Sequence, residues 1–326
     1  SELMHLGVVE LNSKADMVDD EEWMPDIFRT SNSVDVSFLE SEISRVATAL
    51  EAIGKYDTAK KPLFPTREAL GRKSFAEHVD QSRLKMERDA DTAFYAYKGI
   101  ADSQSEINRL RAVITGLQPW ESLDIPLDMH ETGYVDVILG TASAKTDTAR
   151  LAAAAQEQAA SAIVQEVSRD KQQKYYAMIC LKEEKEQALE AMHPFGFTTV
   201  NLADEGTAQE AILRYEKQIK DAEAQIAAHE KTLTELAPAR KDIEYFYDEL
   251  VMHRDRAKII GNMLTTDTVF YFDGWMPKRA QGEVEELLKR YEFYYEIQEP
   301  AEEDDPPVLL SNNGLVTPFE AVTGMY

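Results

Sequence analysis

The sequence predicts an α+β protein in which two ferredoxin-like βαββαβ lobes are joined by a long antiparallel coiled-coil rod. Three observations predict this fold class. Long charged stretches carry apolar residues at alternating steps of three and four, which is typical of coiled-coil helices. An internal stretch has the alternating apolar pattern and the β-branched residues of strands. The two chain ends show the same strand and helix patterns, each supplying part of a second such unit. The lobe formed by the chain ends, the near lobe, is expected to be incomplete at its N-terminal side.

The longest predicted helix runs from Thr207 to about Leu264. At 1.5 Å per residue it would be roughly 87 Å long, far longer than an ordinary domain helix. Pro238 lies inside it and should kink it, because proline cannot donate the helical hydrogen bond. His229 falls on the apolar seam, where we interpret it as a packed side chain or a register device. The predicted seam consists of Ile212, Ile219, Ile226, Leu233, Leu236, Ile243 and Leu250.

Two earlier segments are predicted to pack against this helix, because they repeat apolar residues at the same spacing. The breakers Pro62, Pro65 and Gly71 separate them. The chain must run out and return, so we expect two or three antiparallel helices. A compact helical bundle is the alternative, which the length of the last helix disfavours. The repeating positions are Leu39, Ile43, Val46, Leu50 and Ile53 in the first segment, and Met86, Ala90, Ala93, Tyr97, Ile100, Gln104, Ile107, Leu110, Ile114 and Leu117 in the second.

Residues 119–206 are predicted to form the distal lobe, between the outgoing and returning helices. The expected order is strand, helix, strand, strand, helix, strand, which is the split arrangement of ferredoxin-like folds. The predicted strands cover 134–140, 163–167, 174–181 and 197–202, and the predicted helices cover 147–160 and 183–192.

Residues 1–32 and 265–326 are predicted to form the near lobe and a linker, which leaves 33–118 and 207–264 for the rod. A helix over 3–6 should end at Gly7, because glycine is the usual cap there. Proline-containing, acidic residues 300–307 predict an extended linker. The predicted near-lobe strands cover 7–11, 269–275 and 293–297, with a helix from Pro277 to about 291.

Composition excludes several classes of function. The chain has 326 residues, with 35 Lys+Arg against 60 Asp+Glu and a net charge of −25. Such a charge repels phosphate backbones, so we expect no nucleic-acid partner. Cys180 is the single cysteine, which excludes an intramolecular disulfide and a cysteine-built zinc site. No stretch approaches the ~20 apolar residues of a membrane span, so we expect the polypeptide as given to be soluble. It has no signal peptide, and because it also lacks an initiator Met we expect it to begin inside a longer protein.

No sequence motif predicts catalysis, a cofactor, a metal or a small-molecule substrate. Lys145-Thr146 after a strand invites a phosphate-loop interpretation, but the motif needs glycines where Ala144 and Leu139 stand. A turn with a polar helix cap explains these residues better. The six histidines lack metal-ligand spacing. Cys180 lies on a predicted buried strand, where a small core residue is expected. What remains is a spacer, tether or mechanical element.

The C-terminal segment is more specific, because it carries three short motifs in order. They read G-W-x-P, P-x-x-L-x-N and P-F-E with a later Y. Together they resemble subunit I of the prokaryotic V-type (A-type) ATP synthases, the homologue of eukaryotic vacuolar ATPase subunit a, where these motifs precede the membrane region. The rod and distal lobe match that family in architecture only. The matching residues are Gly274, Trp275, Pro277, Pro307, Leu310, Asn312, Pro318, Phe319, Glu320 and Tyr326.

The resemblance implies the soluble part of an integral membrane subunit, at the cytoplasmic face of the cell membrane. Its lobes would anchor the peripheral-stalk subunits, which hold the catalytic head against rotation. Its own C-terminal membrane domain, absent from this sequence, would lie beside the rotor ring of a proton- or sodium-transporting enzyme. Because the chain stops at Tyr326, before the ion path, it is expected to be a non-catalytic stator brace that resists torque.

A freestanding coiled-coil scaffold or tether with globular ends is the alternative. The stator predicts that the native gene continues past Tyr326 into several ~20-residue apolar spans, whereas the scaffold predicts a stop codon soon after it. The hypothesis that the chain is an enzyme comes third. A metal or cofactor present at near-stoichiometric amounts in the purified protein would support it.

Overall fold

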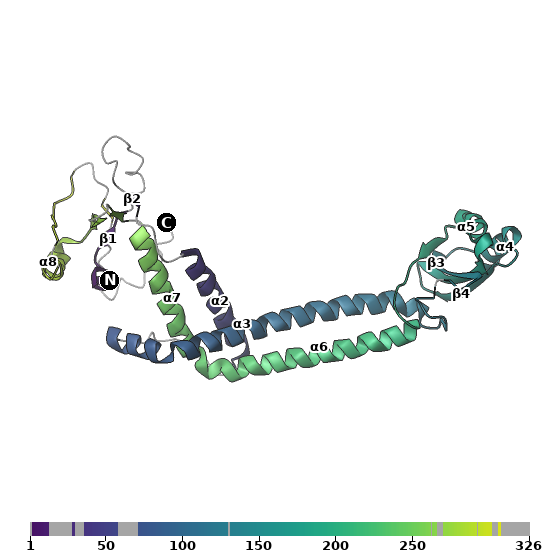
Figure 1. Ribbon diagram of the computed structural model, residues 1–326, viewed down its shortest axis with the longest axis horizontal. Helices are drawn as coiled ribbons and strands as arrows, with labels where there is room; N and C mark the ends of the chain where they lie inside the picture. The colour runs from purple at the N-terminus through teal and green to yellow at the C-terminus, as the bar shows by residue number, and fades with distance from the viewer. Residues whose placement is uncertain are drawn as a thin grey trace. The chain divides into compact units, whose positions relative to one another are not determined.

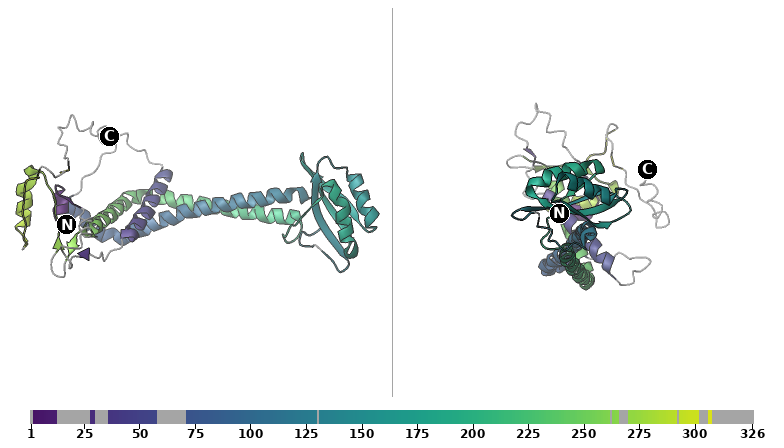
Figure 2. Two further views of the ribbon diagram at one scale, coloured as in Figure 1. Left: turned by 90° about the horizontal axis from the view of Figure 1, so that it is seen from above. Right: turned by 90° about the vertical axis from the view of Figure 1, so that its right-hand side faces the viewer.

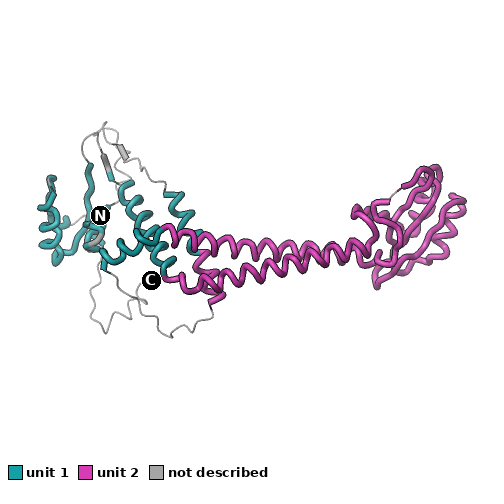
Figure 3. Tube along the Cα trace, turned by 60° about the horizontal axis from the view of Figure 1, so that its bottom comes forward, with its two compact units in different colours: residues 1–47, 69–83, 242–326 teal, residues 48–68, 84–241 magenta. Residues whose placement is uncertain are grey.

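The computed structural model describes residues 2–12, 28–29, 36–57, 71–129, 131–261, 263–265, 270–291, 293–301 and 306–307. The chain divides into two compact units, shown in Figure 3. Unit 1 contains Ser1–Ala47, Ala69–Arg83 and Asp242–Tyr326, and unit 2 contains Thr48–Glu68 and Leu84–Lys241.

Helices dominate both units (Figure 1). The described helices are α1 (Glu2–Leu6), α2 (Val36–Tyr56), α3 (Arg72–Leu117), α4 (Thr148–Gln158), α5 (Lys185–Met192), α6 (Ala208–Leu236), α7 (Arg240–Gly261) and α8 (Gln281–Leu288). The described strands are β1 (Glu10–Leu11), β2 (Phe28–Arg29), β3 (Val135–Ser143), β4 (Ile163–Arg169), β5 (Gln173–Leu181), β6 (Thr198–Val200), β7 (Leu264–Thr265), β8 (Phe270–Tyr271) and β9 (Gly274–Trp275).

The returning helix begins at a capping box and is interrupted at the predicted proline. The Thr207 hydroxyl accepts from the Glu210 N–H at 3.3 Å, and the Glu210 carboxylate accepts from the Thr207 N–H at 2.9 Å. Helix α6 then ends at Leu236, where a 3-10 turn contains Pro238, and α7 continues from Arg240. The predicted helix is therefore two helices with a break at Pro238.

Within unit 2, α3 and α6 lie side by side and antiparallel (Figures 1 and 2). Arg111 of α3 pairs with Glu223 of α6 at 3.4 Å. Further along, the His229 ring of α6 lies over Gly99 of α3, since a Cβ on Gly99 would be 2.4 Å from His229 Nε2. An antiparallel helical pairing is thus confirmed for this unit.

Two predicted seam positions on α3 are wrong. Tyr97 is 41 % exposed, and Gln104 is exposed, whereas Ala96 and Ser103 are buried in their place. The structure thus prefers small side chains here, which let α6 approach closely, as Gly99 also does. A search for large apolar residues at heptad spacing overlooks them.

The sheet of unit 2 has the strand order β4-β5-β3-β6, and every neighbouring pair is antiparallel. The element order β3-α4-β4-β5-α5-β6 is the predicted one. Helices α4 and α5 cover one face of the sheet, where Tyr176, Met178 and Met192 are buried. The other face packs against the ends of α3 and α6 through a second core that contains Trp120 and Tyr175.

In unit 1, charged pairs link α7 to α2 and α3. Lys258 binds Glu40 at 2.7 Å, and Arg83 binds Glu249 at 2.6 Å. The Arg83 guanidinium also lies 5.8 Å from the ring centroid of the buried Phe246. Unit 1 therefore has a helical core of its own.

The chain ends differ from the predicted near lobe. Gly7 does end α1, with a left-handed φ of 62°, as predicted. The predicted strand over 269–275 is instead two separate two-residue strands, β8 and β9, which belong to different sheets. The predicted strand over 293–297 is wrong, because these residues form no strand. A four-stranded near lobe is therefore not seen among the described residues.

Candidate functional site

The residues with reactive or metal-binding side chains have structural surroundings. His78 Nε2 lies 3.1 Å from Asp242 Oδ1, and the His78 ring packs edge-on against Tyr245. Cys180 is buried, and burial, followed by the nearby Asp136 carboxylate, raises the pKa of its thiol. Within the described ranges, no three His, Cys, Asp or Glu side chains converge as metal ligands.

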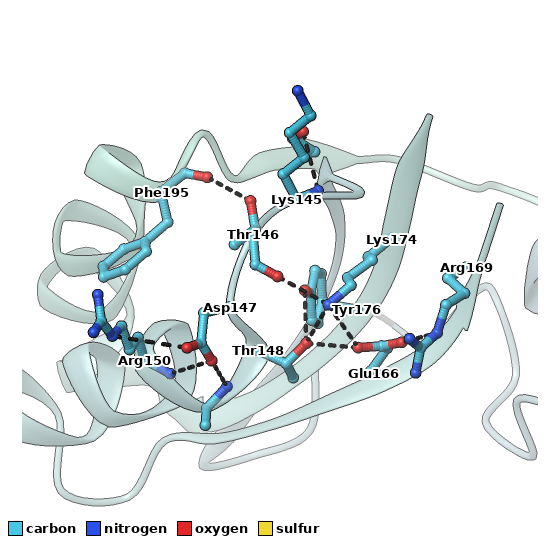
Figure 4. Close-up of polar contacts among 12 residues, drawn as sticks. Lys145, Thr146, Asp147, Thr148, Arg150, Glu166, Arg169, Lys174, Tyr176 and Phe195 are labelled. Atoms are coloured by element: carbon cyan, nitrogen blue, oxygen red, sulfur yellow. Dashed lines mark hydrogen bonds and ion pairs between the residues drawn. The ribbon is translucent and has the colours of Figure 1, made fainter. Parts of the chain in front are cut away.

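The turn between β3 and α4 is a capped helix start (Figure 4). The Asp147 carboxylate accepts from the backbone N–H groups of Ala149 at 3.0 Å and Arg150 at 3.3 Å. The helix terminus is therefore already occupied by a carboxylate of the chain itself. Lys145 points away from this cap in Figure 4, which agrees with the turn interpretation of Lys145-Thr146.

Beside this turn lies a small polar network on the face of the sheet that α4 covers (Figure 4). Lys174 Nζ donates to the Thr146 carbonyl at 2.8 Å and to Thr148 Oγ1 at 3.1 Å, and it lies 3.5 Å from Glu166 Oε2. The Thr148 hydroxyl in turn donates to Glu166 at 2.6 Å. This hydrogen bond, followed by the charges of Lys174 and Arg169, lowers the pKa of Glu166. Every charged member has a partner, so the network fastens α4 to the sheet.

The G-W-x-P element lies where β9 pairs with β1. Gly274 pairs with Leu11, and a Cβ on Gly274 would lie 2.3 Å from the backbone oxygen of Glu10. Only glycine admits this approach without a backbone shift. Trp275 and Pro277 are half-buried, and Pro277 directly precedes a 3-10 turn that leads into α8.

The remaining tail motifs fall mostly outside the described residues. Pro307 is described and exposed. Those outside the described residues are Leu310, Asn312, Pro318, Phe319, Glu320 and Tyr326.

The predicted seam residues of the returning helices differ in burial. Four are buried and three are half-buried. The buried ones are Ile212, Leu233, Ile243 and Leu250, and the half-buried ones are Ile219, Ile226 and Leu236. Between Ile212 and Leu233 the only buried residue of α6 is Ala222, because a pair of helices covers its seam from one side only. Two open grooves of about 340 and 420 Å³ follow from this, one beside Ile226 and one beside His229.

None of the described helices combines the length and the apolar character needed to cross a bilayer.

No family model matches the chain. It is similar to A-type ATP synthase subunit I of Methanocaldococcus jannaschii, with 23% identity over an alignment of 343 residues that covers 98% of this chain and 49% of that protein. The subunit I of Thermococcus kodakarensis is 28% identical over 242 residues, covering 71% of this chain and 36% of that protein. That of Pyrococcus abyssi is 26% identical over 156 residues, covering 46% of this chain and 24% of that protein. The chain thus spans about half the length, or less, of the curated relatives it matches.

A solved structure shows the same fold. The cytoplasmic N-terminal domain of subunit I, homologue of subunit a, of V-ATPase superposes with a TM-score of 0.51 and 17% identity, covering 89% of this chain and 92% of that one. The predicted mixed fold of sheet and long helix is thereby confirmed. The coverage also includes most of the chain, beyond the C-terminal motifs on which the resemblance rested.

Proposed function

We propose, from its homology to the A-type ATP synthase subunit I proteins, that this chain is the cytoplasmic stator part of a rotary proton- or sodium-transporting V/A-type ATPase. It would bridge the peripheral stalks to the membrane domain that translocates ions and would resist the torque of the rotor. The observation that carries this proposal is the similarity to subunit I along nearly the whole chain.

The architecture supports a mechanical task. Resisting torque needs a stiff element, and the paired α3 and α6, with the Arg111–Glu223 ion pair and the His229 ring packed against Gly99, supply one in unit 2. Within this proposal the chain has three parts. The near lobe and linker cover 1–32 with 265–326, the rod covers 33–118 with 207–264, and the distal lobe covers 119–206. The strand order β4-β5-β3-β6 supports a ferredoxin-like distal lobe.

The proposed partners are the peripheral-stalk subunits and a C-terminal membrane domain of the same subunit, which is absent here. The proposed role is non-catalytic and requires no cofactor or small-molecule substrate. It places the chain at the cytoplasmic face of the cell membrane.

A pull-down with the purified peripheral-stalk heterodimer from the same organism tests the proposal. We expect the stalk to retain the chain at moderate and at high salt, and to lose it when residues 133–202 are replaced by a short Gly/Ser linker. Circular dichroism of the deleted chain controls for the helices, since α3 and α6 must remain folded for the comparison to count. A folded intact chain that the stalk fails to retain would favour a freestanding tether instead.

A further inference from the structure

The two faces of the unit 2 sheet are covered to different extents. On the face beneath α4 and α5, side chains such as Met178 and Cys180 are buried along the strands. On the opposite face, the ends of α3 and α6 cover Leu139, Tyr175 and Ala177. Beyond these three residues, towards the end of the sheet where Val135 pairs with Leu181, no helix among the described residues covers that second face.

The uncovered part of this face is apolar across three neighbouring strands. Residues paired across antiparallel strands point to the same face, so strand register places the side chains. Ile179 pairs with both Ile163 and Val137, and Leu181 pairs with Val135 in the next row. Ile163 is 64 % exposed, Leu181 is 41 % exposed, and the other three are half-buried. These five residues, Val135, Val137, Ile163, Ile179 and Leu181, are called the open face below.

An apolar surface is unusual at this position, because the side chains on the solvent-facing side of an antiparallel sheet are normally polar. Contiguous exposed apolar residues on a folded protein mark an interaction surface. The open face therefore indicates a partner rather than solvent.

The charge around the open face restricts the kind of partner. Lys182 and Lys185, which follow directly after Leu181, are engaged with Glu131 and Asp136, each at 2.8 Å. Acidic residues outnumber basic ones over 119–206, and the whole chain carries −25. A second copy of this chain or an anionic membrane would be repelled. A partner with lysine or arginine beside its apolar side chains would be attracted.

The shape of the open face favours a helix over an added strand. Its five residues spread over β3, β4 and β5 instead of following one edge, so a helix lying across the strands contacts all three, whereas an added strand would pair with the edge strand only. The edge strand β4 is also irregular between Glu166 and Ser168, and such a bulge hinders strand addition.

We propose that the open face binds one amphipathic helix of the peripheral stalk, whose apolar stripe is flanked by lysine or arginine. This inference rests on the proposed function for the identity of the partner and adds the surface and the chemistry of contact.

The test titrates the intact chain and its variants with the purified peripheral-stalk heterodimer from the same organism. Ile163→Glu places a charge at the most exposed member of the open face and is expected to weaken binding by about tenfold or more. Ile163→Ala, the milder change, should weaken it several-fold. Leu213→Glu is the matched control, because Leu213 is 60 % exposed on α6 in the same unit and lies outside the open face. Circular dichroism and melting of each variant verify that it is folded.

The outcomes separate the two proposals. Binding that Ile163→Glu weakens and Leu213→Glu leaves unchanged supports both. Wild-type binding that Ile163→Glu leaves intact overturns the open face while the stator role stands. A folded wild-type chain without binding overturns both. Self-association of the wild type in sedimentation, abolished by Ile163→Glu, would show that a second copy covers this face and would overturn the stalk helix as its occupant.

Discussion

Truncation of Leu233 to alanine tests whether α6 is held by its apolar seam. Leu233 is fully buried near the C-terminal end of α6, with 0 % of its surface exposed. The substitution removes about three methyl or methylene groups, worth about 2.4 kcal/mol of lost burial at roughly 0.8 kcal/mol each. The cavity left behind adds to this cost, so the free energy of unfolding should fall by about 2–5 kcal/mol.

Two other leucines in the same helix supply graded controls. Leu236 is half-buried, so Leu236→Ala should cost clearly less than Leu233→Ala. Leu213 is 60 % exposed, so Leu213→Ala should change stability by about 0.5 kcal/mol or less. The three variants differ in burial but share the chemistry of the change and the helix, which removes helix propensity as an explanation.

Urea unfolding followed by far-ultraviolet circular dichroism measures the difference, because helices dominate the signal. In a thermal scan, a loss of 2–5 kcal/mol corresponds to a fall in Tm of roughly 4–20 °C for a unit of this size. Equal stability of Leu233→Ala and Leu213→Ala would refute the reasoning, since it would mean that Leu233 faces solvent and that the paired helices are wrongly placed there.

Three further predictions follow from particular contacts. Gly274→Ala should destabilise unit 1 by about 1–3 kcal/mol, because the new Cβ would lie 2.3 Å from the Glu10 backbone oxygen, whereas Gly282→Ala in α8, with open space around it, should be neutral or slightly stabilising in the same melting assay. Lys185→Met should cost about 1–3 kcal/mol in urea unfolding, because it leaves the buried Asp136 carboxylate without its partner while solvent at the half-exposed Lys185 side chain limits the loss, and Lys182→Met, which breaks an exposed pair, should cost less than Lys185→Met; equal costs would contradict this. The pKa of Glu166 is lowered from its usual 4.5, so its contribution to stability is complete above about pH 4.5 and is lost as the pH falls through the lower folded-state value. Melting measured from pH 6 down to about pH 3 should therefore decline less steeply in Glu166→Gln than in the exposed control Glu157→Gln, and parallel curves would show that Glu166 does not contribute.

The elements that the sequence predicts well are those whose signals are local and long. The helix start at Thr207, the interruption at Pro238 and the order of strands and helices in the unit 2 sheet all follow from residues within a few positions of each element. Each of these features depends on backbone hydrogen bonds and on hydrophobic periodicity, which a single sequence displays.

The features that the sequence misses depend on partners far along the chain. Residues 293–297 have the composition of a strand, but a strand needs a neighbour, and none of the described strands pairs with them. On α3, the small residues Ala96 and Ser103 are buried because α3 and α6 approach closely. The packing of the His229 ring against Gly99 shows this close approach in the structure, whereas the sequence alone does not display it. The small size of residues at heptad spacing was the one available signal.

The open face was missed for the same reason. The β-branched residues of β3, β4 and β5 predict strands, but which of their side chains remain uncovered depends on where α3 and α6 end on the sheet. The short turn between β4 and β5 sets the register of that pair locally, but the extent of the cover depends on residues far along the chain.

Titration of the intact chain with the purified peripheral-stalk heterodimer tests the stator role most directly. The stator account predicts a saturable complex at about 0.05 M and at about 0.3 M NaCl, weaker at the higher salt because charged side chains contribute. A chain that circular dichroism and melting show to be folded, and that forms no complex with the stalk at either salt, would contradict it.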